Sequence, residues 1–550
     1  MSAEIYPEEI LIDSSNLPSF DSDKLEGRIE RPLSRRAFAT VGLVLLLFFG
    51  VYSARAAYLQ ISLGGLYATQ ARENQLSQQI IFADRGSITD RNGTPLAYNE
   101  RLSPSDEFAE RVYAPLQGLA HVVGYVQAPA KDSSGVYYRD VFLGIDGAER
   151  AFNEELSGVN GANLTETNAH GEVVSQSVTQ PPVPGQKITL SIDAGVTQEL
   201  YQAIASLVQS QRFQGGAGVI IDVRTGELLA LTSYPEYSQN ALEQGDAATV
   251  AALNSNPLLP FLNRATDGLY APGSIVKPVV AAAALTEGVI DEHKQILSTG
   301  SISVPNPFDA AHPSVFLDWR PNGWVDMRHA IAVSSDVYFY EVGGGFEDQP
   351  GLGIERLDKY FTMFGFGTAP ALAGFSVQDG TVPTIAWKAA NFPADPTWRI
   401  GDTYHTAIGQ YGVQVTPLQA ALAAATIANG GELLVPTLLA SSTPQGTALA
   451  VSPYALQVAR EGMRLGVTEG IVQVLNFDFV HVAAKTGTAQ VGVKNQYENS
   501  SIIGFFPYEH PRYAFAVILE RAPTGFPHGS PAVMVQLLQW MQQHAPQYLQ

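Results

Sequence analysis

The sequence predicts a mixed α/β protein. Its main domain holds one antiparallel sheet flanked by helices, and a small β-rich domain and one transmembrane helix precede it. Three observations predict this fold class. An uncharged apolar run lies near the N-terminus, and short β-like runs punctuated by Gly and Pro fill residues 77 to about 185. Beyond that point strand-like segments come first and last with helices between them, an order typical of an antiparallel sheet covered by helices.

The apolar run spans Ala37–Ala54 and carries no charge. Its length is close to the lower end for a spanning helix, and Ala56–Ile61 can extend it. We therefore predict a transmembrane helix over residues 37–58. A cleaved signal peptide is the alternative, but the run is long, begins late and lacks a clear small-x-small cleavage site.

Positive charge is unequal on the two sides of this run. Four arginines precede it and two follow it closely: Arg28, Arg31, Arg35 and Arg36, then Arg55 and Arg72. The excess on the N-terminal side predicts a single-pass protein of the cytoplasmic membrane with a cytoplasmic N-terminus and an extracytoplasmic remainder. Residues 1–36, which are rich in Glu, Asp, Ser and Pro, are predicted to form a disordered cytoplasmic tail.

Residues 59–185 are predicted to form the small β-rich domain, which we call the pedestal. A helix is expected from Leu59 to about Leu76, where it leaves the membrane. The segment 181–185, Pro-Pro-Val-Pro-Gly, is typical of a linker and predicts the end of the pedestal.

Residues 186–545 are predicted to form the main domain. Short apolar runs joined by turn residues predict its strands, and helical spacing of apolar residues predicts its helices. The predicted strands are Lys187–Ile192, Gly216–Asp222, Glu227–Ser233, Ser501–Phe506 and Tyr513–Leu519, and the predicted helices are Asp193–Gln209, Val279–Leu285, Thr416–Ala428 and Ala532–Gln543.

Composition excludes several kinds of function. The net charge is −21 with only 15% charged residues, which argues against a nucleic-acid partner because phosphate binding needs clustered Lys and Arg. The chain has no cysteine, so disulfides, thiolate metal sites and thiol catalysis are excluded. Its ten histidines form no ligand-spaced cluster, and we expect neither a metal nor a cofactor.

Ser274 and Lys277 form the first of three candidate catalytic patterns. At positions i and i+3 they lie on one face of a helix, and Pro272-Gly273 fits a helix start. Lys277 can take the proton of Ser274 if it is neutral, which burial or a nearby cation favours. Alone, the spacing arises by chance in many chains.

Ser334 and Asp336 form the second pattern, Ser-Ser-Asp before an aromatic segment. Both side chains can project into a cleft from a loop. The alternative is a cap for the helix that follows.

The third pattern is Lys485-Thr486-Gly487-Thr488. On a strand Lys485 and Gly487 share one face. Lys485 can supply a fixed positive charge, or act as the cation that keeps Lys277 neutral, and Gly487 marks the close approach of another element. The alternative is an edge strand blunted by a lysine.

Together and in this order the three patterns resemble the motif set of penicillin-recognising serine enzymes, and in particular the class B penicillin-binding proteins. Further segments are similar to signatures of that family: Tyr270–Ser274, Lys485–Gln490, Gly409-Gln410, Val415–Gln419, Arg85–Gly93, Arg111-x-Tyr113-x-Pro115 and His121–Tyr125. Asp336, where most of the superfamily has asparagine, resembles the elongation-type members.

The resemblance implies a peptidoglycan D,D-transpeptidase and assigns roles to the motif residues. Catalysis would use Ser274 as nucleophile together with Lys277, Ser334, Asp336 and Lys485, and substrate would contact Thr486, Gly487 and Thr488. The implied substrate is the D-alanyl-D-alanine end of a wall stem peptide, and β-lactams would acylate the same serine. The implied partners are a multispan glycan polymerase of the SEDS type and other wall-elongation proteins.

One departure from the family concerns the pedestal. Only 13 residues separate Ala97 from Arg111, where family members usually carry a substantial head. A D,D-carboxypeptidase or β-lactamase of the same fold is the nearest alternative function, but no clear glutamate lies near the motifs to position a water. A β-lactam sensor or an inactive scaffold is the other, against which the intact Ser274, Lys277 and Lys485 argue.

Overall fold

In the computed structural model, residues 35–73, 75–167, 173–306, 309, 311–525 and 529–550 are described. The chain divides into two compact units, Met1–Gln79 with Leu164–Ser177, and Ile80–Asn163 with Val178–Gln550. Nearly all of the predicted tail lies outside the described residues. The predicted domain boundaries stay predictions.

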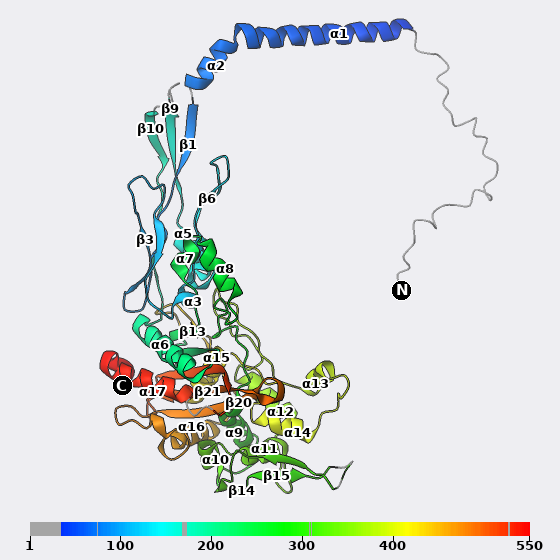
Figure 1. Ribbon diagram of the computed structural model, residues 1–550, viewed down its shortest axis with the longest axis vertical. Helices are drawn as coiled ribbons and strands as arrows, with labels where there is room; N and C mark the ends of the chain where they lie inside the picture. The colour runs from blue at the N-terminus through cyan, green and yellow to red at the C-terminus, as the bar shows by residue number, and fades with distance from the viewer. Residues whose placement is uncertain (1–34, 74, 168–172, 307–308, 310, 526–528) are drawn as a thin grey trace, which may run out of the picture. The chain divides into compact units, whose positions relative to one another are not determined.

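The first unit begins with a long helix (Figure 1). Helix α1 (Arg35–Ala57) continues as a π-helical turn (Tyr58–Ser62), and α2 (Gly64–Glu73) follows it. Within the helix Arg35–Ser62, the most apolar window of 18 residues has a mean hydropathy of 2.1 and is not buried, so by length and composition this helix can cross a membrane. The predicted helix over 37–58 is confirmed as a helix. The helix predicted from Leu59 to about Leu76 is helical only as far as Glu73, because Gln75–Ile81 form a strand.

Most of a three-stranded sheet also belongs to the first unit. Its order is β1-β9-β10, formed by Gln75–Ile81, Gly161–Thr167 and Val173–Gln180.

The pedestal part of the second unit is built from short elements. Its largest sheet has the order β11-β2-β3-β4, from Ile188–Thr189, Ile88–Thr89, Pro95–Glu100 and Glu110–Tyr113. The hairpin from β3 to β4 is closed by residues 101–109 alone, where the sequence predicts a reduced head. The smaller elements are α3 (Ala120–Val123), β5 (Val126–Gln127), β6 (Ala130–Lys131), β7 (Tyr137–Arg139), β8 (Leu143–Gly144), α4 (Gly147–Ala151) and α5 (Asn153–Ser157).

The main sheet has the order β13-β12-β22-β21-β20, and every neighbouring pair is antiparallel, as predicted. Its strands are β12 (Gly215–Asp222), β13 (Leu228–Tyr234), β20 (Ala483–Val491), β21 (Tyr497–Phe506) and β22 (Tyr513–Pro523). Ile220 packs in one hydrophobic cluster, and Val219 and Ile221 pack in another. Because strand side chains alternate, both faces of the sheet are covered by apolar layers.

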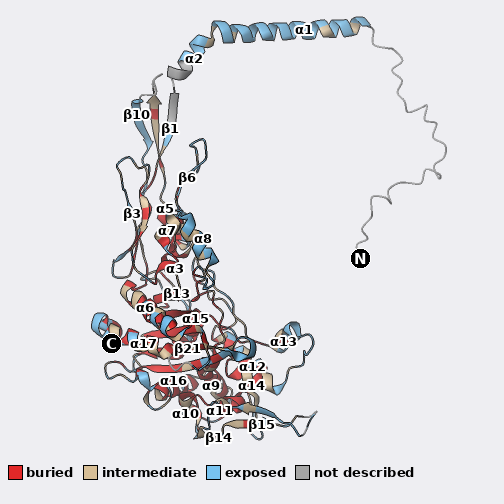
Figure 2. Cartoon of the chain, viewed as in Figure 1, coloured by how far each residue is buried: buried red, intermediate tan, exposed pale blue. Residues whose placement is uncertain are grey.

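Helices α6 (Ala194–Gln211) and α17 (Ser530–His544) supply one layer. Helices α9 (Lys277–Thr286), α15 (Pro417–Asn429) and α10 (Met327–Val333) contribute to the other, and Figure 2 shows α9 and α15 buried throughout most of their length. The remaining elements are α7 (Gln239–Glu243), α8 (Ala247–Ser255), β14 (Ile296–Ser298), β15 (Ser301–Val304), β16 (Ser314–Leu317), β17 (Gly323–Val325), α11 (Asp336–Gly344), α12 (Ile354–Met363), α13 (Ile385–Asn391), α14 (Ile400–Ala407), β18 (Glu432–Leu434), β19 (Gly446–Ala448), α16 (Pro453–Thr468), and the 3-10 turns Gly273–Val276, Gln473–Leu475, Val493–Asn495 and Pro546–Tyr548.

All four predicted helices of the main domain are present, but two predicted features differ. Of the predicted strand Lys187–Ile192, only Ile188–Thr189 (β11) pair with β2. Leu190 instead forms an isolated bridge with Leu439. The expected linker 181–185 is packed against the pedestal. Val183 pairs with Val159, and Gly185 lies so close to Leu156 that a Cβ atom there would be 1.8 Å from its carbonyl oxygen.

A fully buried ion cluster holds the pedestal together. Arg85 Nε and Arg111 Nε each lie 2.7 Å from a carboxylate oxygen of Glu149, and all three side chains have no exposed surface. Burial lowers the pKa of Arg85, and the carboxylate of Glu149 opposes this effect. The two arginines belong to the recognised N-terminal signature, whereas no sequence pattern indicated Glu149 as their partner.

We predict that Glu149→Gln destabilises the protein by about 3–5 kcal/mol, because it leaves two buried guanidinium groups without a counter-charge. The midpoint of thermal unfolding of the full chain in detergent measures the effect. Glu107→Gln, which breaks the exposed ion pair with Lys131, serves as the control and should change the midpoint little. Equal midpoints for the two variants would contradict the role of the cluster.

Candidate active site

Ser274 lies on a 3-10 turn, Gly273–Val276, that leads directly into α9. Pro272 is the N-cap of this turn, which confirms the predicted helix start. A 3-10 turn has three residues per turn, so Ser274 and Lys277 are aligned on one side. Ser274 is half-buried, and in the described part of the chain its hydroxyl has no hydrogen-bond partner.

Strand β20 packs directly against the turn that carries Ser274. A Cβ atom on Gly487 would lie 2.4 Å from the carbonyl oxygen of Pro272, so the close approach predicted at this glycine is confirmed. The Ser501 hydroxyl ties the two elements together, since it donates to the carbonyl oxygens of Pro272 and Gly487 at 2.9 and 3.1 Å. Gly273, with a φ of +59°, faces the backbone of Thr488 in the same way. The backbones of Ser274 and Thr488 are thereby brought side by side.

Lys277 is completely buried and directs its ammonium group toward the second motif. Nζ donates to Asp336 Oδ1 at 2.6 Å, to the Ser334 carbonyl oxygen at 2.8 Å and to Ser334 Oγ at 3.2 Å. These three bonds use all three donors of an ammonium group. Lys277 thus forms an ion pair with Asp336, and the two oxygens of Ser334 accept its remaining hydrogen bonds.

Ser334 and Asp336 reach Lys277 from a tight turn between two helices. Ser334 ends α10 in the left-handed conformation, with a φ of +61°. Ser335 begins α11 as its N-cap, and its hydroxyl accepts from Tyr338 N. The capping interpretation of the Ser-Ser-Asp pattern is confirmed, and the expected cleft position holds for Asp336, which lines a cavity, whereas Ser334 is buried. The middle serine caps the helix, and the two residues that flank it contact Lys277.

Lys485 approaches Ser334 from β20. Its Nζ lies 2.8 Å from Ser334 Oγ and 2.7 Å from the carbonyl oxygen of Thr486. Complete burial, reinforced by repulsion from Lys277, holds the pKa of Lys485 well below its usual range, although Asp336 opposes this shift. The sequence suggested that Lys485 is the cation that keeps Lys277 neutral. The ion pair of Lys277 with Asp336 and the lowered pKa of Lys485 support the opposite arrangement, in which Lys485 gives up its proton more readily.

A cavity of about 590 Å³ adjoins this cluster. Of the predicted site residues, Asp336 and Thr488 line it, whereas Thr486 and Gly487 line a separate cavity of about 210 Å³ that Thr488 also borders. Sequence reasoning missed several other lining residues, namely Trp319, Tyr340, His405 and Tyr411. None of them stands in a pattern that carries chemistry, and burial lowers the pKa of His405. In the described ranges no three His, Cys, Asp or Glu residues form a group that could hold a metal ion.

Comparison with known families matches two parts of the chain. Residues 216–535 match the penicillin binding protein transpeptidase domain, and residues 105–190 match the penicillin-binding protein dimerisation domain. The first match covers more than half of the chain.

Curated and solved proteins agree with these matches. Peptidoglycan D,D-transpeptidase MrdA of Escherichia coli K12 is 29% identical over an alignment that covers 89% of this chain and 92% of the relative. Penicillin-binding protein PBP2 of Helicobacter pylori, solved in complex with MreC, is 26% identical with a TM-score of 0.70 over 86% of this chain and 99% of the solved one. A chain of a peptidoglycan synthase complex that coordinates polymerization and crosslinking is 25% identical, with a TM-score of 0.71 over 93% and 98% of the two chains.

The three motifs meet around Ser334, both predicted domains have family counterparts, and the likeness to MrdA and PBP2 extends over most of the chain. The chain therefore belongs to the penicillin-binding proteins, in the class B, elongation-type group of that family.

Proposed function

We propose that this chain is a peptidoglycan D,D-transpeptidase that cross-links stem peptides through an acyl-enzyme on Ser274. The observation that carries the proposal is the buried cluster in which Lys277 and Lys485 share the hydroxyl of Ser334. Ser274 lies one turn before Lys277, and its hydroxyl has no hydrogen-bond partner among the described residues. Such a cluster can accept a proton from a nucleophile and return it to a leaving group.

The first step activates Lys277. In the proposed resting arrangement Lys277 holds its proton in the ion pair with Asp336, and Lys485, whose pKa burial lowers, is the lysine without one. One proton passes from Lys277 to Ser334 Oγ while the Ser334 hydroxyl proton passes to Lys485, along contacts of 3.2 and 2.8 Å. Lys277 is then neutral and can take the proton of Ser274. Total charge is unchanged by this exchange.

In the acylation step Ser274 Oγ attacks the carbonyl carbon of the penultimate D-alanine, and Lys277 receives the serine proton. The backbone N–H groups of Ser274 and Thr488 form the oxyanion hole, which the close approach of their backbones supports. As the amide C–N bond breaks, Ser334 passes a proton from Lys277 to the leaving D-alanine nitrogen. Lys485, now charged, holds the terminal carboxylate together with the hydroxyls of Thr486 and Thr488.

The second half of the reaction releases the product. An amine of a second stem peptide attacks the ester carbonyl, and its proton passes to Lys277. As the C–O bond of the ester breaks, Lys277 returns this proton to the oxygen of Ser274, which leaves as a hydroxyl. An amide cross-link replaces the ester. A β-lactam opens its ring on the same serine and leaves a longer-lived ester.

We place the catalytic unit outside the cytoplasmic membrane, with α1 as a single-pass anchor and the N-terminus in the cytoplasm. The excess of arginine before α1 supports this orientation. With this orientation we propose residues 1–36 as a cytoplasmic tail and 37–58 as the span. We propose 59–185 as the pedestal and 186–545 as the transpeptidase domain, and the family matches over 105–190 and 216–535 support these two assignments.

We also propose a multispan glycan polymerase of the SEDS type and other wall-elongation proteins as partners. The PBP2 complex with MreC and the synthase complex that couples polymerization to crosslinking support this expectation for related proteins. Because residues 101–109 replace a larger head in this chain, contacts with partners would have to use other parts of the pedestal.

We predict that the full chain in detergent forms a long-lived covalent adduct with penicillin and that Ser274→Ala forms none. Intact mass spectrometry measures the adduct, and Ser255→Ala, an exposed serine at the end of α8, is the matched control. An adduct on Ser274→Ala, or no adduct on folded wild type, would overturn the assignment. Incubation with D-alanyl-D-alanine peptides separates the alternatives, because cross-linked dimers indicate a transpeptidase and free D-alanine without dimers indicates a carboxypeptidase.

We predict that the rate of acylation by penicillin falls as the pH falls through the lowered pKa of Lys485. Protonated Lys485 can no longer accept the proton that must leave Lys277. Lys485→Met and Lys485→Arg should both lower the rate by about 10²–10⁴-fold, since arginine stays charged at any pH that the protein tolerates.

The stability of these variants serves as the control. Between its lowered pKa and its ordinary one, Lys485 is protonated in the unfolded chain but not in the folded chain. Burying this lysine therefore costs stability below its ordinary pKa, and the cost grows as the pH falls toward the lowered pKa. Lys485→Met should therefore keep or raise the midpoint of thermal unfolding at neutral pH. A folded Lys485→Arg variant with the wild-type rate would show that only a fixed positive charge is needed, and would contradict the proton exchange.

A further inference from the structure

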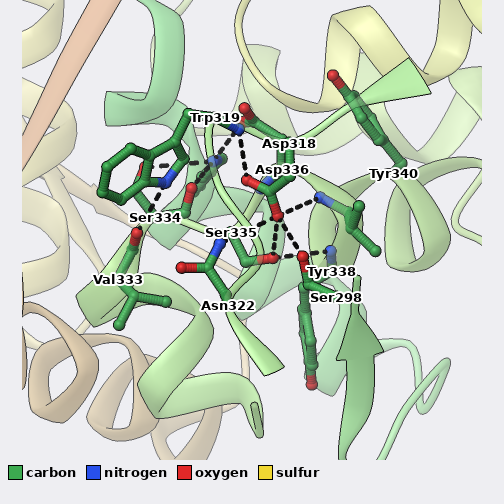
Figure 3. A network of polar contacts seen from close by, with 12 residues as sticks. Ser298, Asp318, Trp319, Asn322, Val333, Ser334, Ser335, Asp336, Tyr338 and Tyr340 are labelled. Atoms are coloured by element: carbon green, nitrogen blue, oxygen red, sulfur yellow. Dashed lines mark hydrogen bonds and ion pairs between the residues drawn. The ribbon is translucent and has the colours of Figure 1, made fainter. Parts of the chain in front are cut away.

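Asp318 follows β16 and lies at the centre of a polar network beside the active site (Figure 3). Its side chain is almost buried, with 8% of its surface exposed. No sequence pattern indicated this residue. Its carboxylate nevertheless accepts six hydrogen bonds, more than any ordinary helix cap requires. Oδ1 accepts from Trp319 N (2.9 Å) and Asp336 N (3.0 Å), and Oδ2 accepts from Ser335 Oγ (2.7 Å), Ser298 Oγ (2.8 Å), Asn322 Nδ2 (3.1 Å) and Val337 N (3.2 Å).

All six partners are donors, so the network requires a carboxylate at this position. Burial works against ionisation, but hydrogen bonds from Asp336 N and from the hydroxyls of Ser335 and Ser298 outweigh it and hold the pKa of Asp318 below its usual range. A charged acceptor also suits the place, because two of the N–H groups open helix α11, where backbone donors are unpaired and the helix dipole favours an anion.

Three of the bonds fix three consecutive residues, Ser335, Asp336 and Val337. The residue just before them is Ser334, whose left-handed backbone turns both its carbonyl oxygen and its hydroxyl toward Lys277. A non-glycine residue holds this conformation only where its surroundings enforce it. The bonds to Asp318 enforce it from the C-terminal side.

Trp319 fixes the same turn from the N-terminal side. Its Nε1 donates to the carbonyl oxygen of Val333 at 3.1 Å, and its own backbone N–H is bound by Asp318. The dipeptide Asp318-Trp319 thus holds the residues on both sides of Ser334, as Figure 3 shows. Trp319 also lines the 590 Å³ cavity, so the clamp lies next to the space where substrate would bind.

We propose that Asp318 is a positioning residue that holds the turn 333–337 so that Ser334 and Asp336 meet Lys277. The inference rests on the proposed function, because its effect is on the proton exchange through Ser334. Asp318 acts through Asp336, whose backbone it binds and whose carboxylate pairs with Lys277 at 2.6 Å. A single hydrogen bond therefore separates Asp318 from the catalytic cluster.

Asparagine cannot replace Asp318 in this network, although it has nearly the same size. If its amide nitrogen takes the place of Oδ2, it faces the N–H groups of Val337 and Asn322. If it takes the place of Oδ1, it faces the N–H groups of Asp336 and Trp319. Either orientation sets donors against donors and leaves buried N–H groups unpaired, which is unfavourable.

The test uses Asp318→Asn in the full chain in detergent, with Asp326→Asn as the matched control. Asp326 caps α10 through His329 N and does not contact the turn. Asp318→Asn should lower the rate of acylation by penicillin about 100-fold. A loosened turn exposes Lys485 to water and raises its pKa. The pH at which the acylation rate begins to fall on the acid side should therefore also move to a higher value. Asp326→Asn should change neither.

If Asp318 only stabilises the fold, Asp318→Asn will lower the midpoint of thermal unfolding. The folded protein will then keep the wild-type acylation rate and the wild-type dependence of that rate on pH, and this result would overturn the proposal. If Asp318→Asn does not fold, Trp319→Phe removes only the Nε1 donor to Val333 and should still lower the rate several-fold. A wild-type rate in Trp319→Phe would then contradict the clamp. If wild type itself is not acylated, the proposed function fails rather than this inference.

Discussion

The active site depends on one constraint, namely that two buried lysines contact a single hydroxyl with only one carboxylate beside them. Nζ of Lys277 and Nζ of Lys485 lie 3.2 and 2.8 Å from Ser334 Oγ, so the two nitrogens are within about 6 Å of each other. Two full positive charges at that distance repel strongly where water is excluded. Asp336 compensates one of them. The other lysine releases its proton most readily, and this is what makes proton exchange through Ser334 possible.

The rest of the domain maintains that constraint. The five-stranded sheet places Lys485 on β20, and the contact between Gly487 and Pro272 presses the turn with Ser274 against the same strand. Helices α10 and α11 meet at Ser334, whose backbone has the left-handed conformation that residues other than glycine rarely adopt. The network around Asp318 supplies the bonds that hold it there. Each motif therefore comes from a different element, and tertiary packing brings the three together.

Much of this arrangement could be predicted from the sequence because it is encoded locally. Short apolar runs predicted β12 and β22, which are buried on both faces. Thr416 with Gln419 forms the capping box that begins α15, and Asp193 caps α6. The spacing of Ser274 and Lys277 placed both on one side of a helical turn. The alternation on β20 placed Lys485 and Gly487 on its buried face.

What the sequence did not reveal depends on contacts between distant residues. Glu149 pairs with Arg85 and Arg111, which lie 64 and 38 positions away, and Asp318 binds residues on three separate segments. Neither carboxylate stands in a distinctive pattern. The charge states of the two lysines were likewise open, because they follow from the depth of burial and from which lysine lies closer to Asp336.

The charge states of the lysines can be measured directly. The chain contains nine lysines, few enough for residue-specific assignment by Lys→Arg substitution in a chain labelled with ¹³C and ¹⁵N at lysine. We expect the side-chain signals of Lys485 to titrate well below those of the exposed lysines and to report a neutral amine in the resting protein, while those of Lys277 report an ammonium. A charged Lys485 beside a neutral Lys277 would contradict the account and restore Lys485 as the fixed cation.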